Sequence, residues 1–157
     1  MLTGTVLFAA TMTTGLMAGV FFIYANAYMP GLGRTDDRTF VGAFQATDRA
    51  IINPLFMGLF FGSLVLIGLA ALLYLGEGAL PWIVVAFVLY LVTVGITVAI
   101  NVPLNDALKA AGDPDTIGDL ARVRKDFNEA RWVAWNWVRV VLSTGAFGCL
   151  VAAVRQS

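Results

Sequence analysis

The sequence contains no histidine and a single cysteine, Cys149. No imidazole is available to bind haem, copper, zinc or non-haem iron, and catalytic triads with a histidine base are excluded. One cysteine forms neither an internal disulfide nor a CxxC site. The chain also lacks a phosphate-binding GxxxxGK[ST] loop, and its ten basic and ten acidic residues cancel. We therefore expect no metal site and no nucleic-acid partner.

Charged residues are also scarce, at 13% of the 157 positions where about 25% is usual. Apolar residues make up 59% of the chain, and the mean hydropathy is +0.82. A soluble domain of this size has too large a surface-to-volume ratio to bury so much apolar surface. The length suits one domain covering residues 1–157. These figures predict an integral membrane protein in contact with a lipid bilayer.

Four runs of about 20 mostly apolar residues predict four transmembrane helices. They cover approximately residues 2–28, 55–75, 81–101 and 135–154. The first run is too long for a signal peptide and lacks a basic segment before it. The expected fold is an all-α membrane four-helix bundle, with two long, partly helical polar loops on one side.

Two glycine pairs fall within the predicted spans, Gly15 with Gly19 and Gly58 with Gly62. Glycines four residues apart allow membrane helices to approach closely. They predict close packing between the first two spans, although glycine is also simply common in membrane helices.

Both long connections contain helix start signals. In residues 29–53, Thr35 is expected to cap a helix whose first turn holds Asp36 and Asp37. In residues 102–134, Asp113 is expected to cap a helix that begins at Pro114.

Apolar residues then recur at helical spacing from Ile117 to Ala130. The pattern predicts one amphipathic helix that lies on the membrane or caps the bundle. Two i,i+4 ion pairs should support it: Arg122 with Asp126 and Lys125 with Glu129.

Basic residues are distributed unequally between the two membrane sides. The side with the long connections holds Arg34, Arg38, Arg49, Lys109, Arg122, Arg124, Lys125 and Arg131, with Arg139 close by. The side with both termini holds only Arg155. The positive-inside rule therefore predicts a multi-pass protein of the plasma or inner membrane, with cytoplasmic long loops and both termini opposite.

Polar residues gather where the spans meet the long connections. The set comprises Tyr24, Asn26, Tyr28, Asp48, Arg49, Asn53, Asn101, Asn105, Asp106, Arg131, Asn136 and Arg139. Polar groups at membrane depth are costly unless paired, so they mark candidate functional sites. A purely structural interpretation stays open: the asparagines can be caps or interhelical contacts, and Arg139 can pair with Asp106 or extend to the interface.

Spacing brings several of these residues together. Trp132, Trp135, Asn136 and Arg139 share one helical face, and Pro103 should break the helix between Asn101 and Asn105. We expect a cavity on the long-loop side lined by Asn101, Asn105, Asp106, Asn136 and Arg139. Aromatic walls and fixed donors suit a planar, lipophilic, hydroxylated molecule. The available bases are Asp48 and Asp106, with Glu129 as a third candidate.

Four segments carry a resemblance to a known family. They are Met17-Ala18-Gly19-Val20-Phe21-Phe22 with Met29-Pro30, Arg49-Ala50-Ile51-Ile52-Asn53-Pro54-Leu55-Phe56, Asn101-Val102-Pro103-Leu104-Asn105-Asp106-Ala107-Leu108, and Trp135-Asn136-Trp137-Val138-Arg139. In this order the chain resembles the anthrone oxygenase family (DUF1772) of small four-span membrane proteins. The resemblance implies oxidation of an anthrone to an anthraquinone, with molecular oxygen as co-substrate and without an evident metal or flavin cofactor.

For such a reaction Asp106 is the candidate base, with Arg139, Asn101 and Asn136 as donors to an enolate oxygen. An aspartate paired with an arginine would be a weaker base. The candidate substrate-binding residues are Asn53, Asn105, Arg49, Trp132, Trp135 and Tyr28. The alternative is a non-enzymatic accessory subunit, or a quinone- or lipid-binding component of a larger membrane complex. A homo-oligomer is equally open.

Overall fold

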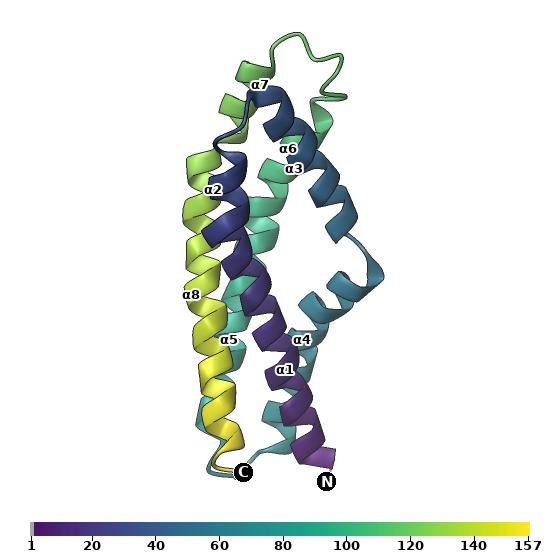
Figure 1. Cartoon of the computed structure of the whole chain (residues 1–157). Helices are drawn as coiled ribbons and strands as arrows, with labels where there is room; N and C mark the ends of the chain where they lie inside the picture. The colour runs from purple at the N-terminus through teal and green to yellow at the C-terminus, as the bar shows by residue number, and fades with distance from the viewer. Residues whose placement is uncertain (1) are drawn as a thin grey trace.

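The computed structural model describes residues 2–157, and within them the fold is all-α with no strand (Figure 1). The elements are α1 (Leu2–Ile23), the π-helix η1 (Tyr24–Tyr28), α2 (Met29–Leu32), α3 (Asp37–Ile51), α4 (Pro54–Leu73), α5 (Leu80–Ile96), the π-helix η2 (Thr97–Asn101), α6 (Val102–Ala110), α7 (Leu120–Phe127) and α8 (Glu129–Val154).

Four helical segments in the described chain are long and apolar enough to cross a membrane: Leu2–Leu32, Pro54–Leu73, Leu80–Ala110 and Leu120–Val154. They confirm a multi-pass helical membrane bundle, and three of them are longer than predicted. At 20 residues, α4 alone measures about 30 Å, the thickness of a bilayer hydrocarbon core. Because the other three segments are longer, they extend beyond the hydrocarbon.

The extensions all lie at one end of the molecule. The extended end consists of α2, α6, α7 and the start of α8, with α3 beside them, while both termini and the α4–α5 turn lie at the other end (Figure 1). Within the bundle α8 packs against α1 and α5, and α1 also packs against α4. Tyr90 on α5 is fully buried and donates a 3.0 Å hydrogen bond to the carbonyl of Phe60 on α4.

The glycine pairs play a different part from the predicted one. Although α1 and α4 do pack together, a Cβ added at Gly19, Gly58 or Gly62 would meet nothing within 4 Å. At Gly15 it would lie 2.9 Å from the ring of Phe147 on α8. Of these four glycines, only Gly15 approaches a neighbouring helix closely, and that helix is α8 rather than α4.

The two long connections fold into what we call the head, comprising α2, α3, α6, α7 and the first turns of α8. Its apolar core consists of Met29, Leu32, Phe40, Val41, Phe44, Leu108, Phe127 and Trp132. The amphipathic segment was predicted either to lie on the membrane or to cap the bundle. Since α7 packs against α3, α6 and α8, it caps the bundle.

Local details of the head differ from the prediction. Asp36, not Thr35, caps α3, because its carboxylate accepts a 3.0 Å bond from the Thr39 N–H. The segment after Asp113 is a turn rather than a helix. Instead, α7 begins at Leu120 with Asp119 as its cap.

The predicted continuous helix is interrupted at Asn128. This residue has a φ of 55°, in the left-handed region that asparagine tolerates, and it ends α7. Its side chain then accepts a 3.2 Å bond from the N–H of Arg131 and caps α8. The predicted ion pair of Arg122 with Asp126 is present at 3.1 Å.

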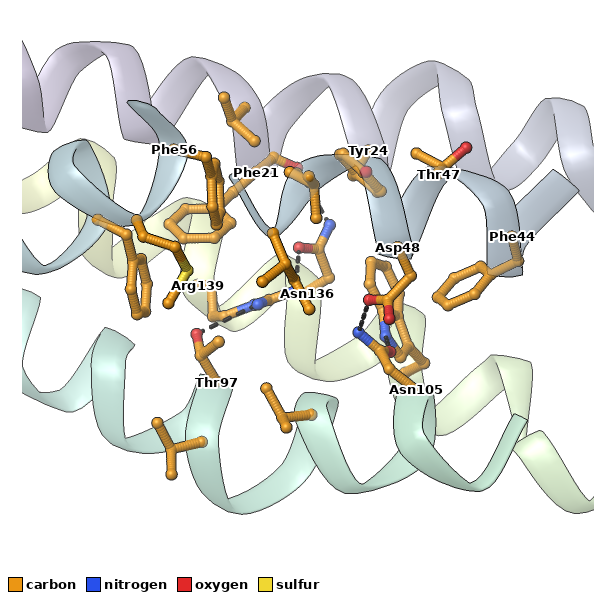
Figure 2. Close-up of a pocket in the computed structure, with 18 of the residues that line it drawn as sticks. Phe21, Tyr24, Phe44, Thr47, Asp48, Phe56, Thr97, Asn105, Asn136 and Arg139 are labelled. Carbon is orange, nitrogen blue, oxygen red and sulfur yellow. Dashed lines mark hydrogen bonds between the residues drawn. The ribbon is translucent and has the colours of Figure 1, made fainter. Parts of the chain in front are cut away.

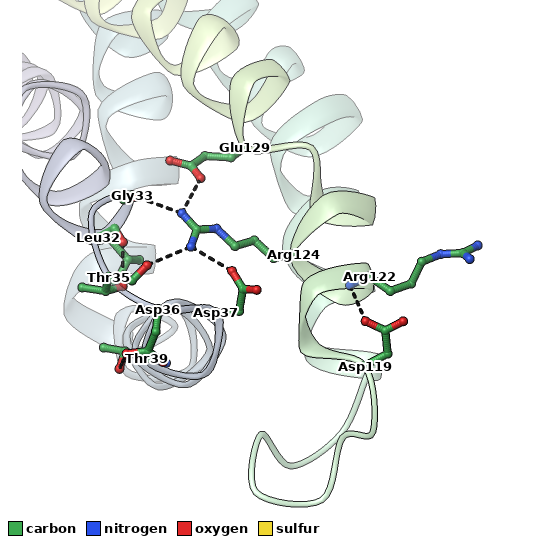
Figure 3. A network of polar contacts seen from close by, with 10 residues as sticks. All are labelled: Leu32, Gly33, Thr35, Asp36, Asp37, Thr39, Asp119, Arg122, Arg124 and Glu129. Carbon is green, nitrogen blue, oxygen red and sulfur yellow. Dashed lines mark hydrogen bonds and ion pairs between the residues drawn. The ribbon is translucent and has the colours of Figure 1, made fainter.

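Arg124 joins the parts of the head (Figure 3). Its guanidinium pairs with Asp37 at 3.1 Å and with Glu129 at 3.2 Å, so Glu129 does not pair with Lys125 as predicted. It also donates to the carbonyls of Gly33 and Thr35 at 2.9 and 3.0 Å. One side chain of α7 therefore holds α3, the α2–α3 connection and α8 together.

Pro103 does not break the helix as predicted. It lies in the first turn of α6, where its missing N–H is tolerated. The irregularity lies just before it, in the wider turn of η2. Isolated π-helical turns are frequent at functional sites, and both η1 and η2 border the cavity described next.

Candidate functional site

A cavity of about 250 Å³ lies where the membrane bundle meets the head (Figure 2). Its walls come from α1 and η1, from the elbow between α3 and α4, from η2 and α6, and from α8. Tyr24 and Tyr28 of η1 and Thr97 and Val98 of η2 line it. The cavity is therefore built around the two irregular turns of the long helices.

Arg139 supplies a buried positive charge to this cavity. Only 5% of the residue is exposed. Its guanidinium donates to the side-chain oxygens of Asn136 at 2.8 Å and Thr97 at 3.2 Å. The guanidinium carbon lies 4.8 Å from the ring centre of Phe21 and 5.3 Å from that of Trp132.

Among residues 2–157, no acidic side chain forms an ion pair with Arg139, and its Nε has no hydrogen-bond partner. A buried charge without a counter-ion is costly, and an unpaired buried donor adds to that cost. A ligand oxygen bearing negative charge would supply what the guanidinium lacks.

Asn136 fixes the position of Arg139. Its side-chain nitrogen donates a 3.0 Å bond to the carbonyl of Phe21, in the last turn of α1 before η1. Its side-chain oxygen is thereby directed at the guanidinium. The residue is fully buried, so the arrangement is shielded from competing water.

A second polar group lies at the head end of the cavity. Asp48 of α3 accepts a 2.7 Å bond from the Asn105 amide and forms a 2.7 Å ion pair with Lys109. Lys109 also pairs with Asp106 at 3.0 Å. Asn105 in turn accepts a 2.8 Å bond from the indole N–H of Trp132. These contacts connect α3, α6 and α8 across that end.

The two carboxylates differ in exposure. The Asp48 side chain is 9% exposed and the Asp106 side chain 60%. Of the two, only Asp48 lies in surroundings from which water is largely removed.

The remaining walls are mainly aromatic and aliphatic. Tyr24 packs beside Trp132 with ring centres 6.0 Å apart, and beside Tyr28 at 4.8 Å. Tyr28 donates a 2.7 Å bond to Thr47, so its hydroxyl is already occupied. No cluster of three or more Cys, Asp or Glu side chains in the described part of the chain is placed to hold a metal ion.

Six of the ten site residues predicted from the sequence line this cavity: Tyr28, Asn105, Asp106, Trp132, Asn136 and Arg139. The other four do not. Asn101 is buried and donates a 3.3 Å bond to the carbonyl of Trp132. Asn53 caps α4 by accepting from the N–H of Phe56. Arg49 donates to Gln45, and Trp135 is half-buried outside the cavity.

The alternative ion pair between Arg139 and Asp106 is not formed. The Asp106 carboxylate pairs with Lys109 instead. Sequence reasoning missed Thr97 and Lys109. Both follow the same four-residue spacing as Asn101 and Asn105, which is the signal that could have found them.

No curated protein and no solved structure matches the chain. A family model described as anthrone oxygenase matches residues 56–149. The matched segment covers more than half of the 157 residues and includes Thr97, Asn105, Asn136 and Arg139. By this match the chain belongs to the anthrone oxygenase family.

Proposed function

We propose that the protein is a membrane-bound oxygenase that uses molecular oxygen, without a metal or flavin, to oxidise a lipophilic aromatic substrate of the anthrone type. The observation that carries the proposal is the buried Arg139 guanidinium, which has no acidic partner and faces a cavity with aromatic walls. Family membership supports the same chemistry.

The cavity fits the expected orientation of such a substrate. Fused rings would lie among Phe21, Tyr24, Phe56 and Trp132, where flat apolar surfaces pack favourably. The substrate oxygen would point at the guanidinium of Arg139, which lines the cavity and is held in place by Asn136 and Thr97. Charge developing on that oxygen would be stabilised by a donor already held in place.

The chemistry needs no further reductant. A base removes a proton from the benzylic carbon and leaves an enolate, whose electrons reduce oxygen as a carbon–oxygen bond forms. The peroxide takes up a proton and becomes a hydroperoxide. Loss of the second benzylic proton with cleavage of the O–O bond then releases water and leaves a carbonyl. One oxygen atom enters the product and the other becomes water.

We assign the base to Asp48 in preference to Asp106. Asp48 is buried at the cavity wall, whereas the Asp106 side chain is mostly exposed. Asn105 and Lys109 hold the Asp48 carboxylate in place. Arg139 would assist proton removal by stabilising the enolate that forms.

Oxygen uptake tests the proposal. The purified protein in liposomes is given an anthrone, and uptake and quinone absorbance are recorded together. Arg139→Gln should lower turnover by about 10²–10³-fold, as removal of one oxyanion donor does. Arg155→Gln changes the same residue type at the opposite end and should leave turnover unchanged. Equal turnover in both variants would refute the proposed role of Arg139.

The alternative, a protein that binds a quinone or lipid without turnover, would use the same cavity. It predicts ligand binding to the wild-type protein with no oxygen uptake above the rate in protein-free liposomes. Oxygen uptake in liposomes therefore distinguishes an oxygenase from a protein that only binds its ligand.

The orientation in the membrane is part of the proposal. The head carries nearly all the basic residues, so we place it in the cytoplasm at the plasma or inner membrane. In a Cys149→Ala background, Ser157→Cys should react with an impermeant maleimide in intact cells, and Thr116→Cys only after permeabilisation. The reverse pattern would invert the assignment.

A further inference from the structure

Four large apolar residues both line the cavity and are exposed on the outer surface. Ile52 is 57% exposed, Phe61 43%, Val98 55% and Val102 38%. They come from the α3–α4 elbow, α4, η2 and α6 respectively. The cavity is therefore open between α4 and the η2–α6 segment. We call these four residues the rim.

The middle of the rim, at Phe61 and Val98, lies beside the hydrocarbon, while Ile52 and Val102 lie where the bundle meets the head. The length of α4 matches the hydrocarbon thickness, and Phe61 is two turns inside its first residue, Pro54. Val98 belongs to the membrane-spanning segment Leu80–Ala110. Because all four side chains are apolar, the surface that the opening presents is suited to acyl chains.

Polar contacts join α3, α6 and α8 at the head end of the cavity, beside the exposed Asp106. The Asp48 carboxylate is held by Asn105 and by Lys109, and Asn105 is held by Trp132. A ligand that entered between α3 and α6 would have to separate these contacts. A ligand that entered across the rim would break none of them.

The α3–α4 elbow accounts for the opening. Ile52 ends α3 with a non-helical ψ of 74°. Asn53 caps the start of α4, because its side-chain oxygen accepts a hydrogen bond from the Phe56 N–H. The two helices diverge at this point, and the elbow projects from the bundle (Figure 1). Residues of the elbow and of η2 both line the cavity.

We infer that the rim is a lateral portal, through which a lipophilic aromatic ligand exchanges between the bilayer and the cavity. The inference rests on the proposed function only for the class of ligand. Such a molecule partitions into the hydrocarbon, where its local concentration exceeds that in water, and it reaches Arg139 without leaving an apolar environment.

Exchange kinetics test the portal. The probe is 1,8-dihydroxyanthraquinone, which is already oxidised and cannot turn over, loaded into liposomes that contain the protein. Its fluorescence follows association and dissociation in a stopped-flow instrument under nitrogen. Val98→Phe and Ile52→Phe add bulk at the rim. Val88→Phe is the matched control, because Val88 is on α5, 52% exposed and outside the cavity.

A narrower portal slows entry and exit equally. We expect Val98→Phe and Ile52→Phe to lower both rate constants by about fivefold or more while Kd changes less than about twofold. Val88→Phe should match the wild type. Rates equal to wild type in both rim variants, a change in Kd without slower association, or no binding to the wild-type protein would overturn the inference. Because no turnover is measured, a failure of the oxygenase proposal would show only in the oxygen assay.

Discussion

Arg139 is positioned by a neutral side chain: its guanidinium donates a 2.8 Å hydrogen bond to Asn136, which is itself anchored to the Phe21 carbonyl at 3.0 Å. A carboxylate at this place would hold the arginine equally well but would neutralise it. An amide fixes the geometry and leaves the positive charge available to a ligand. This pair is the centre of the functional account.

The Asn136→Asp substitution should keep Arg139 in position but neutralise its positive charge. The new carboxylate would pair with Arg139, so ligand affinity should fall about tenfold or more and turnover about 10²-fold. Titration with 1,8-dihydroxyanthraquinone and oxygen uptake measure the two effects. Asn53→Asp is the control, since aspartate caps α4 as well as asparagine and Asn53 lies outside the cavity. Unchanged affinity in Asn136→Asp would contradict an anionic ligand oxygen at Arg139.

Asp48→Asn should remove the base and leave the binding site. We expect turnover to fall by about 10²–10⁴-fold, the usual contribution of general base catalysis. Under nitrogen, exchange of the benzylic protons of an anthrone with deuterated water should slow by a similar factor. Asp106→Asn, at the exposed end, should change either rate less than about threefold. If Asp106→Asn proved the slower variant, the base would be Asp106, as the sequence alone suggested.

Arg124→Met should destabilise the head by about 2 kcal/mol, because several partly buried acceptors lose their donor together. Arg122→Met is the matched control. Its ion pair with Asp126 has side-chain exposures of 72% and 65%, and such pairs contribute about 0–1 kcal/mol. Denaturant unfolding of the two variants in detergent measures the difference. Equal destabilisation would show that Arg124 does not join the head as described.

Asp36 should make the stability of α3 depend on pH. The Thr39 N–H and hydroxyl both donate to its carboxylate and hold the pKa of Asp36 below its usual value of 3.8. The ionised group stabilises the fold above the unfolded-state pKa, and this contribution is lost as pH falls through the lower folded-state pKa. At pH 7 the wild type should have a higher melting temperature than Asp36→Asn. The difference between the two melting temperatures should shrink below pH 3.8. A difference independent of pH would rule out this linkage.

The sequence predicted the membrane bundle well because long apolar runs have few other solutions. Within α8, helical spacing also brought Trp132, Asn136 and Arg139 to one side. Trp135 does not line the cavity. It lies about 60° around the helix from Trp132, at the edge of that face.

Other parts of the site depend on contacts that local spacing does not contain. Asn101 and Asn105 were both expected to line the cavity, but the wider turn of η2 ends at Asn101 and alters the helical register there. Asp48 meets Lys109 only because the head packs α3 against α6. In residues 29–53, the capping signals predicted a helix. They did not predict that this helix would pack against α6.

Isotope labelling tests the central claim most directly. The purified protein in liposomes is given an anthrone under ¹⁸O₂, and the quinone is analysed by mass spectrometry. We predict one ¹⁸O atom in each quinone molecule formed, the other in water, and loss of labelled product in Arg139→Gln. Quinone formed without ¹⁸O, or formed with the wild-type protein no faster than with Arg139→Gln or in protein-free liposomes, would contradict an oxygenase built around Arg139.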